Sequence, residues 1–265
     1  MHILASINWL YSASGFVVGA LVGMTGVGGG SLMTPLLVLV FGFHPATAVG
    51  TDLLYAAATK SVGTLVHGSR RTVDWPIVGR LAAGSLPGAA LTLLALRAFG
   101  ASGGGTSHLI TLVLAIALFL TALSLLFRDR LFAWARTKVP QPRQQTVVVM
   151  TILTGLVLGV VVSISSVGAG AIGVTALIAL YPSMPTVRIV GSDIAHAVPL
   201  TLLAGIGHLL VLGTTDFGLL GSLLVGSIPG IVLGSVVATR VPETVIRPLL
   251  AGVLVLVGMK LVGVF

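Results

Sequence analysis

The feature that most constrains this chain is a series of apolar segments with little polar sequence between them. Polar residues, Pro and Gly divide it into ten segments, at 9–25, 29–42, 46–67, 75–99, 107–127, 146–164, 169–181, 187–212, 217–239 and 244–264. A helix needs about 20 residues to cross the ~30 Å hydrocarbon core of a bilayer. Segments two and seven are shorter, so we expect short, broken helices there. The pattern predicts an all-α polytopic membrane protein with about ten membrane segments.

The composition supports a lipid-facing protein. Only 8% of the 265 residues are charged, and the mean hydropathy is +1.14. An average soluble domain has about 25% charged residues, so this chain cannot cover a water-soluble surface with charge. Cysteine is absent, which excludes disulfides, thiolate nucleophiles and Cys-ligated metals. The net charge of +8 does not indicate a nucleic-acid partner, because the basic residues fall at the ends of segments.

Lys and Arg are distributed unevenly between the two sets of loops. The loops around 42–46, 100–106 and 213–216 contain neither residue. The opposite set, with Arg80 close by, carries Arg70, Arg71, Arg128, Arg130, Arg136, Lys138, Arg143, Arg188, Arg240 and Arg247. The positive-inside rule therefore predicts a plasma-membrane protein with its basic loops in the cytoplasm and both termini outside.

The second half of the chain repeats the first. Residues 15–32, GFVVGALVGMTGVGGGSL, match 155–172, GLVLGVVVSISSVGAGAI, without a gap. Further on, HPATAVGTD matches MPTVRIVGSD with one extra residue, and GSLPG matches GSIPG. Each half has five segments, an odd number, so we expect the second copy to be inverted. The predicted organisation is a first repeat over 1–127, a basic cytoplasmic linker over 128–145 and a second repeat over 146–265.

Inverted repeats with a broken helix in each half are typical of secondary transporters, whose binding site lies near the membrane midplane. The alternative is that duplication only builds a stable bundle. The two matching breaks, at 23–31 and 163–171, would expose the N-termini of short helices, where backbone N–H groups and the helix dipole favour an anion. The predicted binding residues in the breaks are Thr25, Gly28, Gly29, Gly30, Ser31, Ser165, Ser166, Gly168 and Gly170.

Ionisable residues inside the segments complete the predicted site. Asp52, Lys60, Asp193 and His196 are expected to face a cavity or one another, because a charge at the bilayer centre is costly. Asp52 and Lys60 are eight positions apart and cannot pair on one straight helix, which leaves Lys60 free to meet the end of a broken helix. Asp193 and His196 are three positions apart and can touch on one helix face. The position that matches Lys60 falls near Thr201, so this cation has no twin, which favours a single anion site.

Structural roles are the alternatives for several of these residues. Lys60 could extend to the membrane interface, and Asp52 and Asp193 could cap helices or tether loops. His67 and His208 are predicted to be hydrogen-bonded structural groups, with a proton relay as the alternative. GSLPG and GSIPG are predicted to form turns or kinks at which the segments flex.

The chain resembles the sulfite exporter TauE/SafE family of membrane permeases. The resemblance rests on the break GVGGGSL, the following HPATAVGTDL, the later GSLPG and the degenerate second copy. The resemblance covers nearly the whole chain. It implies a bacterial or archaeal plasma-membrane carrier for sulfite, sulfonates or other small organic or sulfur-containing anions. It fixes neither one anion nor the direction of transport.

The sequence thus predicts a secondary carrier for small anions that works by alternating access, without a cofactor or a metal. A cation or metal permease that uses the intramembrane Asp and His residues is the alternative. We predict no enzyme activity, because the chain has no HExxH motif and no obvious Ser/His pair at a workable spacing. The expected partners are the lipid bilayer and a small anion, and nucleic acid is not expected. Coupled protons and a homo-oligomer are both compatible with the sequence.

Overall fold

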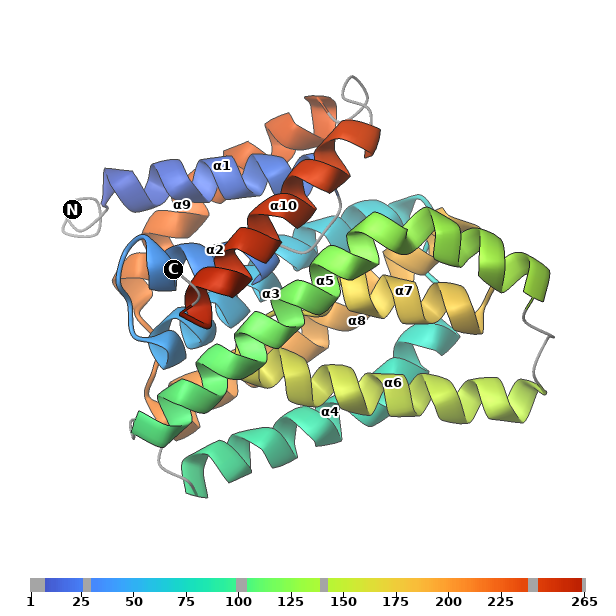
Figure 1. Ribbon diagram of the computed structural model, residues 1–265, viewed down its shortest axis with the longest axis horizontal. Helices are drawn as coiled ribbons and strands as arrows, with labels where there is room; N and C mark the ends of the chain where they lie inside the picture. The colour runs from blue at the N-terminus through green and yellow to red at the C-terminus, as the bar shows by residue number, and fades with distance from the viewer. Residues whose placement is uncertain (1–7, 26–29, 99–103, 139–142, 238–242, 264–265) are drawn as a thin grey trace.

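The computed structural model is a bundle of α-helices joined by short connections (Figure 1). It describes residues 8–25, 30–98, 104–138, 143–237 and 243–263, and no β-strand occurs within these ranges. Their helices are α1 (Trp9–Thr25), α2 (Gly30–Leu39), α3 (Pro45–Ser69), α4 (Trp75–Ala98), α5 (Gly104–Lys138), α6 (Gln144–Ser165), α7 (Ala171–Leu180), α8 (Thr186–Gly207), α9 (Phe217–Val237) and α10 (Glu243–Leu261). A π-helical turn, η2 (His208–Leu212), continues α8. The prediction of an all-α protein is confirmed.

The helix boundaries follow the apolar segments closely. Helices α2 and α7, at the two positions where short helices are expected, have 10 residues each. In the described part of the chain, five helical stretches are long and apolar enough to cross a membrane: Trp75–Ala98, His108–Arg128, Gln144–Ser165, Thr186–Leu212 and Phe217–Gly234. Helix α5 continues to Lys138, so the first part of the 128–145 segment is helical.

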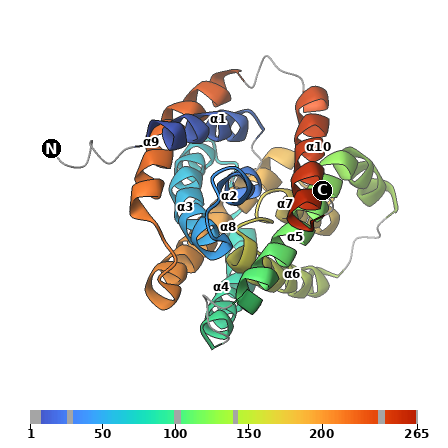
Figure 2. The same ribbon diagram turned by 60° about the vertical axis from the view of Figure 1, so that its left-hand side comes forward.

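Helices from the two halves of the chain pack against each other in matching pairs. Helix α1 packs along α9, α6 packs along α4, and α5 packs along α10. Helices α3 and α8 pack on each other, and Figure 2 shows them with α2 in the middle of the bundle, with other helices around them. Much of α2, α3 and α8 is therefore held inside the protein, although Leu65 of α3 and Val187 of α8 are exposed.

The GSLPG and GSIPG sequences lie inside α4 and α9, so the prediction of a turn is wrong. A Cβ atom at Gly84 would overlap the backbone of Ile152 in α6, and one at Gly226 would overlap the backbone of Ser12 in α1. Small residues allow membrane helices to approach this closely. The glycines of these motifs are thus explained by the tight crossing of α4 with α6 and of α9 with α1.

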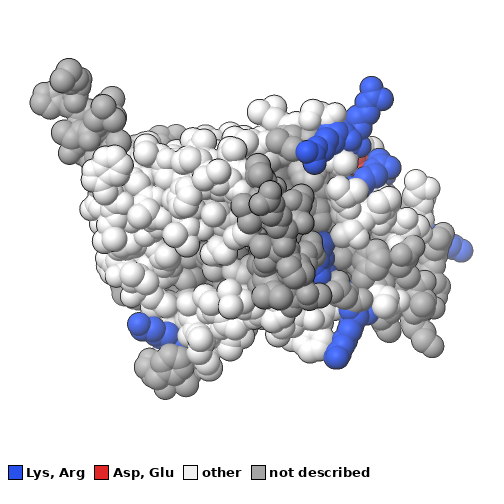
Figure 3. Space-filling model, turned by 90° about the horizontal axis from the view of Figure 1, so that it is seen from above, with Lys and Arg blue, Asp and Glu red and all other residues white. Residues whose placement is uncertain are grey.

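The outer surface is apolar over much of the bundle. Figure 3 shows a broad area without charged side chains, while Lys and Arg gather mostly in the right-hand half of that view. Large apolar side chains are exposed along several outer helices, among them Leu91, Leu123, Val157, Val232 and Leu256. A surface of this kind is suited to lipid rather than to water.

Candidate functional site

The break in the second half of the chain lies between α6 and α7 and is buried. Gly168 and Gly170 have φ angles of 123° and 130°, and Ser166 has a φ of 59°. Glycine reaches such angles without a steric penalty, whereas a side chain there is strained. The two glycines are therefore needed for the path of the chain, which reverses between the end of α6 and the first turn of α7.

The break in the first half lies at the matching position. Helix α1 ends at Thr25 and α2 begins at Gly30, while Gly28 and Gly29 lie outside the described residues. Ser31, in the first turn of α2, is buried. Both short helices thus begin at the C-terminal end of the predicted breaks.

Lys60 joins the two halves of the chain at the second break. Its ammonium Nζ, from the middle of α3, donates a hydrogen bond of 3.1 Å to the backbone oxygen of Ala169. Ala169 is itself buried. Lys60 therefore contacts the second break, a partner of the kind that the sequence leaves open to it, rather than extending to the interface.

The carboxylate of Asp52 connects α3 with both short-helix regions. Asp52 is fully buried, and the hydroxyl of Thr34 in α2 donates to its Oδ2 at 2.5 Å. The hydroxyl of Ser166, in the second break, also lies close to it. Sequence reasoning missed Thr34, although its position three residues after Ser31 places both on one face of α2. Asp52 therefore tethers α2 to α3, one of the structural roles considered for it.

Asp193 occupies the matching position on α8, but its surroundings differ. It is 1% exposed, and neither of its carboxylate oxygens accepts a hydrogen bond of normal geometry from the described residues. The backbone of Gly170 and the charge of Lys60 lie within electrostatic range. In α7, Gly173 lies directly against Oδ1. By the internal match, Thr34 corresponds to Val174, so Asp193 has no equivalent hydroxyl donor.

The predicted contact between His196 and Asp193 is not formed. The Nε2 atom of His196 shares a hydrogen bond of 2.8 Å with the hydroxyl of Ser85 in α4, while its Nδ1 atom has no partner among the described residues. The ring therefore points toward α4 and makes no hydrogen bond with the carboxylate of Asp193. In the internal match His196 corresponds to Tyr55 and Ser85 to Ser227, and the Tyr55 hydroxyl lies near Ser227. Sequence reasoning missed both serines. The fact that GSLPG and GSIPG each contain a serine at the same position could have pointed to them.

Two other histidines are hydrogen-bonded structural groups, as predicted. The Nδ1 atom of His67 lies 2.8 Å from the hydroxyl of Thr72, and that of His208 lies 3.0 Å from the hydroxyl of Thr214. The Nε2 atom of His208 also lies 2.9 Å from the backbone oxygen of Ser163. These histidines fix the ends of α3 and of the α8–η2 segment.

The two serines at the second break are used differently. The hydroxyl of Ser165 donates to the backbone oxygen of Val161 at 2.7 Å and accepts the N–H of Val167 at 3.2 Å. The Ser166 hydroxyl is buried and has no hydrogen bond of normal geometry with the described residues. Ser165 thus stabilises the break, whereas the hydroxyl of Ser166 lies beside the carboxylate of Asp52.

The buried centre contains one ammonium and two carboxyl groups, on α3 and α8. Lys60 lies within electrostatic range of both Asp52 and Asp193. With both carboxylates ionised, the three groups would carry a net charge of −1, and with both protonated the charge would be +1. Because charge is costly inside a membrane, this arrangement can hold an anion best when the carboxyl groups carry protons.

Comparison with known proteins gives consistent matches. The family model described as sulfite exporter TauE/SafE matches residues 11–261. The probable membrane transporter protein YjnA of Bacillus subtilis (strain 168) is 39% identical over 251 residues, which cover 94% of this chain and 97% of that protein. The probable membrane transporter protein YdhB of the same organism is 29% identical, over 91% of this chain and 97% of its own length. No solved structure matches the chain.

Proposed function

Since this chain belongs to the sulfite exporter TauE/SafE family and is a membrane transporter, we propose that it is a secondary carrier for small anions. The best candidates are sulfite, sulfonates and related organic or sulfur oxyanions. The family description names sulfite, whereas the relatives' printed names give no substrate. The class of ligand is therefore argued from the buried centre.

The observation that carries this proposal is the contact of Lys60 with the second break. The ammonium lies 3.1 Å from the Ala169 oxygen, two residues before the first turn of α7. A helix N-terminus presents unpaired N–H groups and a partial positive charge. A fixed cation beside such a terminus is suited to an oxyanion. The residues proposed to bind the anion together with Lys60 are Thr25, Gly28, Gly29, Gly30, Ser31, Asp52, Ser165, Ser166, Gly168, Gly170, Asp193 and His196.

The transport cycle we propose is alternating access between two inverted repeats of five membrane segments each. The matching helix pairs support it, because α1 with α9 and α6 with α4 are equivalent under exchange of the halves. The proposed orientation places the basic loops in the cytoplasm and both termini outside the plasma membrane. The two halves would rock around the centre that holds Lys60. Lys60 belongs to the first half and contacts Ala169 in the second.

Protons are proposed to accompany the anion, and Asp193 is the residue best placed to carry one. Asp52 accepts a hydrogen bond from Thr34, which stabilises its ionised form. Asp193 lacks such a donor and is buried. The other ionisable groups around it are Lys60 and Asp52 on α3 and His196 on α8. A proton on Asp193 would neutralise its carboxylate. The positive charge of Lys60 would then no longer be balanced by Asp193, so the centre would attract an anion.

Reconstitution into proteoliposomes tests this function. We expect uptake of sulfite or of a short alkyl sulfonate by vesicles with the protein and not by empty vesicles. The same ligands should protect the purified protein against heat, whereas divalent metal ions should not. Protection and flux with divalent cations alone would contradict the proposal and favour a metal permease.

A further inference from the structure

A cavity lies away from the buried centre, at the end of the bundle where α7 is followed by α8. Its volume is about 660 Å³, and two guanidinium groups and a phenol line it, from Arg80, Arg188 and Tyr181. Gln144 and Val147 of α6 and the turn 182–185 complete its wall. Helix α7 has 10 residues, so at 1.5 Å per residue this cavity lies ~15 Å from the second break.

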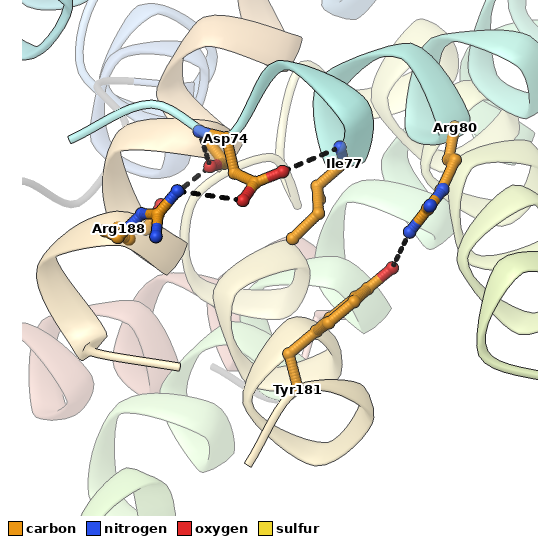
Figure 4. Close-up of polar contacts among 6 residues, drawn as sticks. Asp74, Ile77, Arg80, Tyr181 and Arg188 are labelled. Carbon is orange, nitrogen blue, oxygen red and sulfur yellow. Dashed lines mark hydrogen bonds and ion pairs between the residues drawn. The ribbon is translucent and has the colours of Figure 1, made fainter. Parts of the chain in front are cut away.

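Arg80 is held in the cavity wall by a directed series of hydrogen bonds, of which Figure 4 shows the one with Tyr181. The Thr151 hydroxyl donates its proton to the backbone oxygen of Val147 at 2.7 Å, so it must accept from the Tyr181 hydroxyl, 2.8 Å away. Tyr181 in turn accepts from the Arg80 guanidinium at 3.2 Å. The guanidinium has five N–H donors, and no carboxylate in the described ranges pairs with it. Its orientation is fixed while most of its donors remain unused.

Arg188 is fixed from outside the cavity. Its guanidinium donates to Oδ2 of Asp74 at 3.0 Å, and Asp74 is not part of the lining (Figure 4). The other oxygen of Asp74 accepts the N–H of Ile77 at the start of α4. The side chain of Arg188 is 45% exposed, so part of the guanidinium faces the open space. The cavity thus has a positive wall that no carboxylate lines.

The matching positions at the opposite end of the bundle carry no such charge. Asp216 caps α9 as Asp74 caps α4, through the N–H of Leu219 at 2.9 Å. There, however, the residues that correspond to Tyr181 and Thr151 are Phe41 and Tyr11, whose rings pack edge to face at 4.9 Å. Those that correspond to Arg80 and Arg188 are Ser222 and Thr47. The aspartate caps belong to the shared repeat, whereas the arginines occur at one end only.

We propose that this cavity is a peripheral binding site for an oxyanion group, a sulfonate, sulfate or phosphate. Arg80 supplies the main charged donors, Arg188 supplies a second charge, and Tyr181 is the residue that positions Arg80. Two sources share this chemistry, a free anion from the aqueous phase and the phosphate of an anionic lipid headgroup. The proposal rests on the cavity itself and does not require that the anion be transported.

The test measures binding without flux on the full-length protein in nanodiscs. Thermal protection is recorded against sulfate in nanodiscs of phosphatidylcholine alone, and against an increasing share of phosphatidylglycerol without sulfate. Arg80→Gln is compared with Arg97→Gln, which removes the same charge from the exposed last turn of the same helix. Tyr181→Phe serves as the second variant, because it keeps both charges. Lys60→Met is included to separate this site from the buried centre.

We expect protection of the wild type by at least one of the two ligands. The apparent affinity should fall about tenfold in Arg80→Gln, the effect of one lost charge-assisted hydrogen bond. It should fall less in Tyr181→Phe and stay unchanged in Arg97→Gln. Lys60→Met should lose only the protection that arises at the buried centre and keep the part that Arg80→Gln removes. Protection by sulfate alone would identify a free anion as the source, and protection by phosphatidylglycerol alone would identify a lipid. The proposed site would be overturned if the wild type were not protected, or if Arg80→Gln were protected as well as the wild type. Loss of protection only in Lys60→Met would also overturn it, because the sulfate response would then arise at the buried centre.

Discussion

Gly173 in α7 lies directly against the carboxylate of Asp193 in α8, so a Cβ atom at this glycine would overlap Oδ1. The internal match places Met33 at the corresponding position in the first half. The two halves therefore differ at their centre, where one carboxylate is bound to a threonine and the other faces a glycine. This asymmetry leaves Asp193 without the hydroxyl donor that Asp52 has.

Gly173→Ala tests this contact. The added methyl group should displace the Asp193 side chain and destabilise the protein by about 1–3 kcal/mol, the usual effect of overpacking. Anion flux should fall with it. The control is Gly221→Ala in α9, where nothing lies within 4 Å, so it should match the wild type in melting temperature and in flux. Equal behaviour of the two variants would exclude a close approach of Gly173 to Asp193.

Lys60→Met removes the central cation and keeps the length of the side chain. We expect anion flux in proteoliposomes to fall at least about tenfold, because a charge-assisted hydrogen bond contributes about 1.5–3 kcal/mol. Lys260→Met removes a lysine from the exposed last turn of α10 and should leave flux within about twofold. Full flux in Lys60→Met, at normal expression, would rule out Lys60 as the anion-binding cation.

Asp193→Asn tests the coupling of protons to the anion. If protonation of Asp193 favours anion binding, as proposed, wild-type flux should rise as the pH falls on the side from which the anion enters. The asparagine is permanently neutral, so its flux should no longer depend on pH in this way. Asp216→Asn keeps a good cap at the start of α9 and should retain the wild-type pH dependence. Identical pH profiles for Asp193→Asn and the wild type would place the coupling elsewhere.

Gly84→Ala tests the close crossing of α4 and α6. Its methyl group would overlap the backbone of Ile152, which cannot move without shifting the helix, so we expect a loss of about 1–3 kcal/mol in stability. Gly79→Ala lies in the same helix with nothing within 4 Å and should be neutral or slightly stabilising, because alanine favours helix over glycine. Thermal unfolding in detergent separates the two. A melting temperature of Gly84→Ala equal to that of Gly79→Ala would contradict the crossing.

Much of the helical framework could be predicted from the sequence, because each helix forms from its own apolar residues. The short helices α2 and α7 were expected for the same reason, since glycines interrupt the apolar runs before them. The contact of Lys60 with the second break could also be anticipated. A lone intramembrane cation needs a partner, and the buried carbonyl groups of a broken helix are among the few available.

The partners of the other polar residues could not be predicted in this way. Asp193 and His196 lie within reach on one helix, yet the imidazole bonds to Ser85 in α4 instead. The choice depends on how closely α4 approaches α8, and a single helix carries no information about its neighbours. The same holds for GSLPG, whose glycines look like hinge residues until α6 is placed against them.

The sequence by itself determined where the helices form, where they break and which residues recur in both halves, since these follow from local hydropathy and from comparison of the chain with itself. The tertiary structure alone decided that Thr34 would bind Asp52, that Gly173 would face Asp193, and that Arg80 would be fixed by Tyr181. Each of these contacts joins residues on different helices. Their distances are set by the packing of whole helices, which no local pattern specifies.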